Sequence, residues 1–196
     1  MIGLLSGQLL HKKAPFLVLS VQGVGYELQA PMNTFYDLPA TGKDVTLYTH
    51  LVVREDNWQL FGFCTERERE LFRLLIKANG IGPKVALSML SAMPVETLVS
   101  CMQSSDTSLL TRIPGIGKKT AERLLVEIRE PLKKWLTQLD QPISTDPLST
   151  LQEDAISALM SLGYKDAAAK KAIAAVKEQA DDVESLIRLA LQGMTA

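Results

Sequence analysis

The 196-residue chain is poor in the side chains that hold metals and form disulfides. It has two cysteines, Cys64 and Cys101, two histidines and no CxxC pair. So few thiols and imidazoles exclude a disulfide framework and give no basis for a zinc site. The sequence therefore predicts neither a metal ion nor a cofactor, and we expect both cysteines to be ordinary small apolar residues.

Long hydrophobic runs are also missing. The apolar stretches near the N-terminus are interrupted by Ser6, Gln8 and the step His11-Lys12-Lys13. We expect neither a signal peptide nor a membrane span. Together with the low cysteine content, this predicts a cytoplasmic protein.

Signatures of catalysis are incomplete. The run Gly-Ile-Gly-Lys-Lys-Thr at 115–120 resembles a phosphate-binding loop, but Arg112 stands where the first glycine of GxxxxGK[ST] is required. His11 and His50 lie in strand-like segments, where a structural role is expected and no Ser-His-Asp arrangement is indicated. The sequence predicts no catalytic residues and no ATPase of its own.

The net charge of −1 conceals an uneven distribution of charge along the chain. Residues 64–137 contain twelve basic and eight acidic residues, a net +4, whereas residues 1–63 carry −1 and residues 138–196 carry −4. The central third is therefore the candidate region for binding an anionic polymer such as DNA.

The first 63 residues show the two-residue alternation of apolar side chains that is typical of β-strands. Several short strands in so few residues predict a small OB-like β-barrel, spanning 1–63. The segment 16–21 is nearly continuously apolar, which favours a strand buried on both faces. The last two strands, 45–53 and 58–63, are expected to form a hairpin with Arg54-Glu55-Asp56-Asn57 at its tip.

From Thr65 onward the apolar period becomes helical. Thr65 and Glu68 have the spacing of a capping box, and helices are expected near 83–92, 94–102, 106–112 and 118–134. Residues 64–137 are therefore interpreted as an all-α domain, which makes the chain an α+β multidomain protein.

The remaining third divides into a linker and a module. Residues 138–150 contain two prolines and several Ser and Thr residues, which predicts a flexible linker. Residues 151–196 contain three amphipathic helical stretches and are acidic. We expect a small three-helix, UBA-like module that binds a partner protein rather than DNA.

The strongest indication of function is an internal repeat. Residues 80–90 are GIGPKVALSML and residues 115–125 are GIGKKTAERLL, identical at six of eleven positions. Glycines allow a phosphate to approach the backbone, the isoleucine can point into the core, and the amides at the start of the next helix favour an anion. The predicted DNA-binding residues are Gly80, Ile81, Gly82, Lys84, Gly115, Ile116, Gly117, Lys118 and Lys119.

Two such units form a tandem helix-hairpin-helix, which would grip both strands across a minor groove. They contact phosphates and not base edges, so binding is predicted to be independent of sequence. A single Gly-Ile-Gly could merely end one helix and begin another, but two copies with matched lysines favour DNA binding. A glycosylase or nuclease of helix-hairpin-helix type, and a general duplex-binding module, remain as alternatives.

The motifs together resemble one known family. VVREDNWQLFGF at the end of the barrel, NGIGPK, PGIGKKTAERLL and ALMSLGY are similar to the RuvA family of Holliday-junction-binding proteins over essentially the whole chain. The resemblance implies a homotetramer, alone or stacked face to face as an octamer. This assembly would hold a four-way DNA junction open during recombination and repair, as a non-catalytic subunit.

The resemblance also assigns roles within the barrel and the helical domain. Glu55 and Asp56 match the acidic pins that lie at the centre of the junction, where like-charge repulsion of phosphates guides the strands apart. Arg54 would contact DNA near the crossover. Arg123 would reach the DNA backbone from the helix of the second hairpin.

For the C-terminal module the resemblance implies a protein partner, the hexameric AAA+ ATPase RuvB. Leu159, Leu162 and Tyr164 are the apolar candidates for this contact, with Tyr164 expected to be the most exposed. Leu159 and Leu162 could instead be core residues of the module. The junction resolvase RuvC is a further expected partner.

Overall fold

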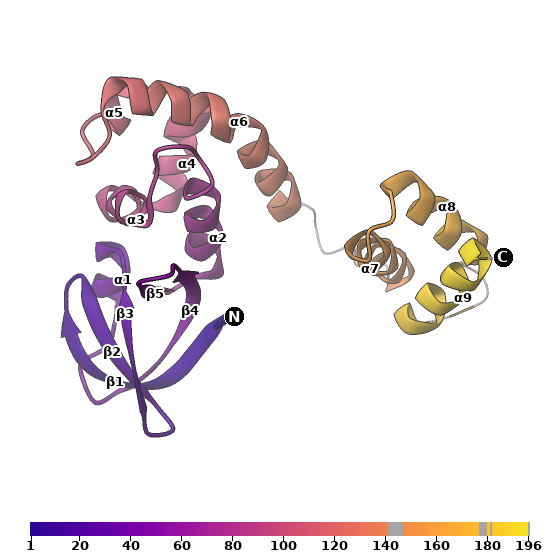
Figure 1. Ribbon diagram of the computed structural model, residues 1–196, viewed down its shortest axis with the longest axis horizontal. Helices are drawn as coiled ribbons and strands as arrows, with labels where there is room; N and C mark the ends of the chain where they lie inside the picture. Colours follow the sequence, from indigo (N-terminus) through magenta and orange to yellow (C-terminus); the bar gives the residue numbers. More distant parts are fainter. Residues whose placement is uncertain (141–146, 177–179, 181, 196) are drawn as a thin grey trace. The chain divides into compact units, whose positions relative to one another are not determined.

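The computed structural model describes residues 1–140, 147–176, 180 and 182–195 (Figure 1). The chain forms two compact units, Met1–Trp135 and Leu136–Ala196, each of which is considered by itself. The segment expected as a linker is helical at both of its described ends, since 138–140 continue helix α6 (Lys118–Asp140) and 147–150 begin helix α7 (Pro147–Ser161). No proline or glycine interrupts the chain between Pro131 and Pro142, which explains the longer helix. The remaining part, 141–146, lies outside the described residues.

The first unit begins with a closed five-stranded barrel in the order β1-β2-β3-β5-β4, which confirms the predicted OB-like barrel. All pairings are antiparallel except the parallel contact between β3 and β5. The strands are β1 (Leu4–Lys13), β2 (Phe16–Val21), β3 (Val24–Gln29), β4 (Asp44–Val53) and β5 (Trp58–Phe63).

Strand β2 is buried on one face only. Leu17 and Leu19 are fully buried, whereas Phe16 is 43% exposed. The expectation of a strand covered on both faces is therefore wrong. A small closed barrel fills its interior with alternate side chains and leaves the outward-facing ones to the solvent or to other elements.

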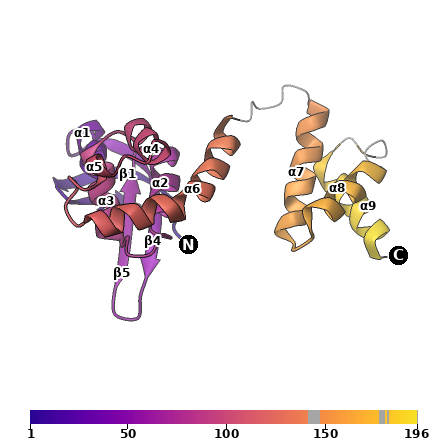
Figure 2. The ribbon, with the colours of Figure 1, turned by 90° about the horizontal axis from the view of Figure 1, so that it is seen from above.

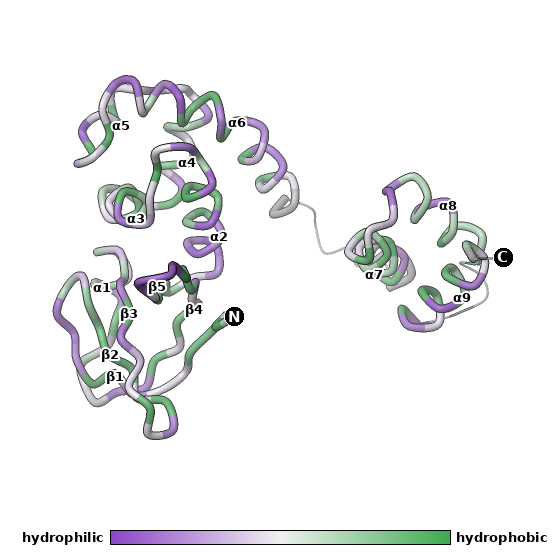
Figure 3. Tube along the Cα trace, in the orientation of Figure 1, coloured by the Kyte–Doolittle hydropathy of each residue, from purple (hydrophilic) through white to green (hydrophobic). Residues whose placement is uncertain are grey.

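The β4–β5 hairpin has the predicted bounds within one residue. Val53 pairs with Trp58, and the Arg54 amide donates a 2.9 Å hydrogen bond to the Asn57 carbonyl oxygen across the tip. Figure 2 shows this hairpin extending beyond the other elements of its unit. The turn is strongly hydrophilic (Figure 3).

Six helices complete the first unit: α1 (Met32–Asp37), α2 (Glu66–Leu75), α3 (Pro83–Ala92), α4 (Val95–Gln103), α5 (Thr107–Leu110) and most of α6 (Lys118–Asp140). The predicted capping box begins α2. The Glu68 amide donates to Thr65 Oγ1 at 3.2 Å, and the Thr65 amide donates to Glu68 Oε2 at 3.1 Å. These reciprocal bonds fix where the chain changes from barrel to helix.

Helix α2 is attached to the barrel by aromatic packing. The Phe72 ring lies 5.0 Å from the ring of Phe61 and 5.0 Å from that of Phe63, measured between centroids. All three side chains are fully buried. His50 meets the same Phe72 ring edge-on at 5.7 Å.

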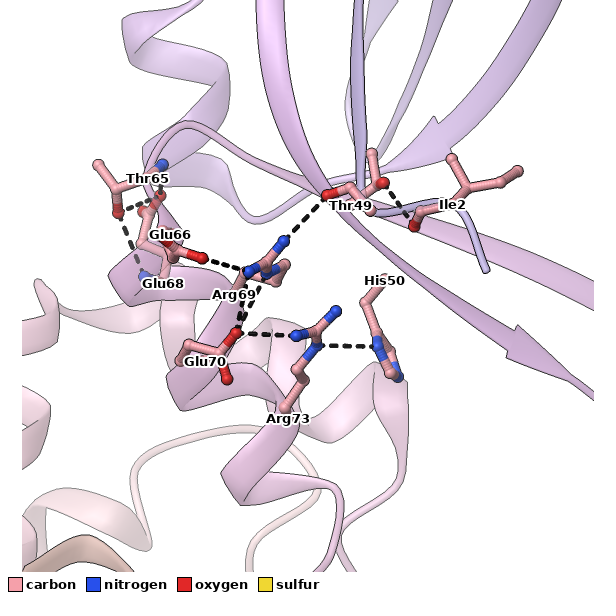
Figure 4. Close-up of polar contacts among 10 residues, drawn as sticks. Ile2, Thr49, His50, Thr65, Glu66, Glu68, Arg69, Glu70 and Arg73 are labelled. Carbon is pink, nitrogen blue, oxygen red and sulfur yellow. Dashed lines mark hydrogen bonds and ion pairs between the residues drawn. The ribbon is translucent and has the colours of Figure 1, made fainter. Parts of the chain in front are cut away.

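Polar contacts also join α2 to the barrel (Figure 4). The Arg69 guanidinium donates to the Gly3 carbonyl oxygen at 2.9 Å, and Arg73 donates to His50 Nδ1 at 3.2 Å, while Glu70 pairs with both arginines. Burial, followed by the Arg73 charge, lowers the pKa of His50. The neutral imidazole thus serves as an acceptor that fixes α2 against the barrel.

A short helix that the sequence did not indicate, α1 (Met32–Asp37), joins the barrel to α3. Asn33 Nδ2 donates to the Leu90 carbonyl oxygen at 2.8 Å, and the Met32 amide donates to Ser91 Oγ at 3.0 Å. Together with α2, this contact holds the β4–β5 hairpin and the helical hairpins in one unit.

Among its described residues, the second unit has the end of α6 and the helices α7 (Pro147–Ser161), α8 (Asp166–Val176) and α9 (Val183–Thr195). Its core is small and aliphatic. The fully covered side chains are Ala155, Leu159, Ala169, Ile173, Leu186 and Ala190. This confirms a C-terminal helical module.

Among the described residues, no single helix has the length and hydropathy needed to cross a membrane. By length and composition alone, α3 and α4 pass as a pair, with a bend of 104° between them.

Candidate nucleic-acid interface

The two Gly-Ile-Gly segments form the same turn. The Ile81 amide donates to the Ala78 carbonyl oxygen at 3.1 Å, and 35 residues later the Ile116 amide donates to Ile113 at 3.1 Å. The third residue of each turn has a positive φ, +82° at Gly80 and +90° at Gly115. Side chains rarely adopt this conformation, which explains a glycine at both positions.

The repetition extends beyond the segment that is visible in the sequence. Ile76 bonds back to Phe72 at 3.1 Å, as Thr111 does to Thr107 at 3.0 Å, although these residue pairs share no identity. The structural repeat therefore includes the end of the preceding helix in each copy, α2 and α5.

Each turn opens directly into a helix. The first helical hydrogen bond is donated by Ala86 to Gly82 at 3.0 Å in α3, and by Ala121 to Gly117 at 2.9 Å in α6. The amides before these residues have no partner within their helix and are available to an anion. Pro83 removes one such donor from α3, so the second hairpin has one amide more.

The isoleucines lie as predicted. Ile81 is 3% exposed and Ile116 is 4% exposed, so both point into the core of the first unit. Around Gly82 and Gly117 the space where a Cβ would project is open, with no atom within 4 Å. An approaching phosphate therefore meets bare backbone at these two glycines.

The turn of each hairpin lies close to the helix that follows the other turn. A Cβ on Gly115 would lie 3.3 Å from Val85 Cγ2, at the start of the other hairpin's helix. A Cβ on Gly80 would collide with the guanidinium of Arg123 from α6. The absence of a side chain at Gly80 and Gly115 thus allows a side chain of the other hairpin to approach each turn closely.

Arg123 is exposed on α6, and its guanidinium lies on the first hairpin's turn, where Nη2 donates to the Asn79 carbonyl oxygen at 2.6 Å. Glu127, one helical turn further along, accepts from the Asn79 amide at 2.7 Å and from Asn79 Nδ2 at 3.2 Å. We call Asn79, Arg123 and Glu127 the clamp.

Sequence reasoning missed Asn79 and Glu127. The hydrogen bond from the Asn79 amide is the largest cause that lowers the pKa of Glu127, and the nearby Arg123 charge acts in the same direction. The spacing of Arg123 and Glu127, four residues apart on one helix, was the available signal. It gave no indication of the partner.

Two sets of basic residues in this region differ in their pairing. Arg67, Arg69 and Arg73 on α2 are paired with glutamates. Lys84, Lys118 and Lys119 are exposed beside the helix starts, and within the described residues they form no ion pair. The three lysines predicted to face phosphate therefore keep their charge free of ion pairs among the described residues.

The tip of the β4–β5 hairpin is fully open to solvent. Arg54, Glu55 and Asp56 are exposed, as expected. At its base the structure shows two exposed apolar side chains that were not anticipated, Val53 at 58% and Trp58 at 73%.

The candidate partner surface of the C-terminal module requires correction. Leu159 is fully buried in the module core and presents no surface, while Leu162 is 63% exposed. Tyr164, expected to be the most exposed, is half-buried against the core.

The cause of this arrangement is the way α7 ends. Gly163 has φ +96° and donates to Met160 at 3.0 Å, while the Tyr164 amide donates to Leu159 at 3.2 Å. This is a Schellman motif, which brings the residue after the glycine back over the last turn of the helix. It places Tyr164 against the core and leaves Leu162 outside.

The cysteines are separate from these surfaces. Cys64 and Cys101 are not bonded to each other. Burial, with Glu68 and Asp37 nearby, raises the pKa of the Cys64 thiol to about 11. In the part of the chain that the structure describes, no three His, Cys, Asp or Glu side chains come together as a metal site.

The geometry defines a tandem helix-hairpin-helix protein with an OB-like barrel. Three family models match the chain: "RuvA N terminal domain" over residues 1–62, "SAM-like Helix-hairpin-helix tandem" over 72–130 and "RuvA, C-terminal domain" over 150–195. The chain belongs to the RuvA family.

Individual relatives are similar over their whole length. The Holliday junction branch migration complex subunit RuvA of Pseudomonas fluorescens (strain Pf0-1) is 52% identical over 201 residues, covering 99% of this chain and 100% of the relative. The proteins of the same name from Pseudomonas savastanoi pv. phaseolicola and Stutzerimonas stutzeri are 54% and 51% identical, each with 99% of this chain and 100% of the relative covered.

Proposed function

We propose that this protein binds four-way DNA junctions without reading base sequence and holds them open for branch migration in recombination and repair. The observation that carries the proposal is the duplicated turn. Two hairpins of equal backbone geometry each present bare glycine backbone, unpaired helix amides and unneutralised lysines. Such contacts fix a phosphate and leave the base edges untouched.

The β4–β5 hairpin supplies a preference for a branched substrate. In one unit with the phosphate-binding turns, Glu55 and Asp56 project on an exposed tip. Carboxylates at a branch point repel phosphates and direct the strands into separate grooves. Arg54, next to these acids, would contact DNA near the crossover.

The assembly follows from the same chemistry. A homotetramer, alone or stacked as an octamer, would present one set of hairpins to each arm. Many weak phosphate contacts would then act together and give strong binding of the junction. The clamp gives Arg123 a positioning role in this scheme, since it supports the first turn from α6.

The energy for movement would come from a partner. We assign no catalytic residue to this chain and expect the AAA+ ATPase RuvB to bind the module 151–196, with the junction resolvase RuvC as a further partner. Leu162 is the residue of the predicted partner set with the most exposed side chain, and Tyr164 would contribute its accessible edge. Like chromosomal DNA, the complex would be cytoplasmic.

The test is a salt-titrated mobility-shift competition between a four-way junction and a linear duplex of the same sequence. We expect a junction preference that persists as salt rises, because many phosphate contacts act together. Equal affinities that fall together with salt would contradict the proposal, and cleavage or base release would identify an enzyme instead.

Two variants refine this test. Gly82→Ala with Gly117→Ala places methyl groups in open space, so we expect an intact fold and weakened DNA binding. Glu55→Gln with Asp56→Asn is expected to leave binding intact or tighter and to alter branch migration. No effect of the second pair on either property would contradict the role of the acidic tip.

A further inference from the structure

The tryptophan at the base of the acidic tip is exposed to an unusual degree. Trp58 is 73% exposed, although Phe61 and Phe63 on the same strand are fully buried. Large apolar side chains that are left exposed commonly mark binding surfaces.

The ring does not stand alone. It lines a cleft between the barrel and the helical hairpins, within the unit Met1–Trp135. Phe16, Asn57 and Trp58 contribute from the barrel, and Lys84, Ser88 and Pro114 contribute from the other wall. The cleft therefore contains the lysine of the first hairpin and the turn proline of the second.

We propose that Trp58 is a stacking platform for a nucleobase at the junction crossover, an inference that rests on the proposed function. An aromatic face beside an unpaired lysine and amide side chains is the combination that binds unstacked nucleic acid, with the ring covering a base and the cation meeting its phosphate. Glu27 also lines the cleft, so a purely apolar protein partner would cover two charged side chains, Lys84 and Glu27, without offering either a polar contact.

The position of the ring explains why it would act at a crossover. Trp58 follows the tip directly, so the repulsive carboxylates of Glu55 and Asp56 and the ring would meet the same few nucleotides. The carboxylates exclude phosphates, whereas an uncharged ring favours a base face. In an open junction the pairs at the branch point have a face without a stacked neighbour, and a linear duplex offers none. Trp58 would therefore add affinity for the junction only.

The experiment uses the fluorescence of Trp58 in the full chain. The protein has two tryptophans, so Trp135→Phe leaves Trp58 as the single reporter. We expect a four-way junction to quench its emission strongly and a linear duplex of the same sequence to change it little. In a mobility shift, Trp58→Ala should weaken junction binding roughly tenfold, and Trp58→Phe should retain most of it.

The control is a second exposed aromatic residue. Tyr36 is 75% exposed and does not line the cleft, so Tyr36→Ala should bind the junction like the parent protein. Duplex affinity should be the same, within about twofold, for Trp58→Ala and Tyr36→Ala.

The outcomes separate the two proposals. If Trp135→Phe binds the junction in the mobility shift while Trp58 emission stays unchanged, the stacking role is overturned and the proposed function stands. If the emission changes on dilution of the protein without DNA, Trp58 belongs to a contact between copies, and the inference is again overturned. If the parent protein shows no preference for the junction, the proposed function itself fails.

Discussion

The two hairpins share a backbone and differ in what supports it. Both turns close with the same hydrogen bond at the same distance, from Ile81 in one and Ile116 in the other. The first turn is also tied to α6 by the clamp, whereas Gly115 in the second turn packs against Val85. The two copies therefore share the geometry of the turn, whereas the side-chain contacts that support the turn differ between them.

The largest expected effect tests whether the two copies are anchored equally. Ile81→Ala and Ile116→Ala should each lower the free energy of unfolding by about 2–5 kcal/mol, because each leaves a cavity in the core. Chemical denaturation followed by circular dichroism measures this loss. The conservative controls Ile81→Val and Ile116→Val should cost about 0.5–1.5 kcal/mol. A cost near zero at one position only would show that its turn is not fixed by the isoleucine.

The turn glycines are expected to have the next largest effect. Gly80→Ala and Gly115→Ala force a side chain into positive φ, at about 1–2 kcal/mol each. Gly80→Ala must also displace Arg123, so it should release the clamp, while Gly115→Ala presses on Val85. Thermal unfolding of both variants gives the comparison.

The matched controls for these variants are the other two glycines. Gly82→Ala and Gly117→Ala meet open space and should change the free energy of unfolding by less than about 0.5 kcal/mol. Equal destabilisation by all four substitutions would contradict the assigned difference between the turn and helix-start positions.

Local features of the hairpins could be predicted from the sequence, and long-range ones could not. Thr65 and Glu68 lie three residues apart, and the burial of Ile81 and Ile116 follows from their place between glycines, so both were accessible to pattern reasoning. The clamp joins Asn79 to Glu127 across 48 residues, and no periodicity connects these positions.

The same limit explains the errors elsewhere. Phe16 is apolar, but its exposure depends on the closure of the barrel. The burial of Tyr164 depends on the positive φ of Gly163, which folds the chain back over α7. In both cases the sequence predicted the strand or helix. Whether the side chain is buried or exposed depends on the tertiary structure around it.

The two hairpins also differ in the number of lysines that could contact DNA. The second hairpin has Lys118 and Lys119, whereas the first has Lys84 and loses an amide donor to Pro83. Removing both lysines of the second hairpin should reduce the slope of log affinity against log salt by roughly two, and Lys84→Ala by roughly one. Mobility shifts over a salt series measure these slopes. The control is Lys43→Ala, which removes an exposed lysine of the barrel and should leave the slope unchanged. Equal slopes for all variants would show that these lysines do not contact phosphate.

The smallest expected effect is a pH dependence confined to the first hairpin. The pKa of Glu127 is lowered in the folded protein, chiefly because the Asn79 amide donates to its carboxylate. A lowered pKa means that the stabilisation is complete above the ordinary glutamate value of 4.5 and is lost as the pH falls through the folded value. The parent protein should therefore have a higher melting temperature than the Glu127→Gln variant at neutral pH. The two melting temperatures should converge as the pH falls below about 4.5. Glu122→Gln, on the exposed face of the same helix, should follow the parent at every pH. A constant difference between Glu127→Gln and the parent down to pH 3 would mean that the carboxylate charge is not what holds the first turn, and the clamp would then reduce to the Arg123 contact.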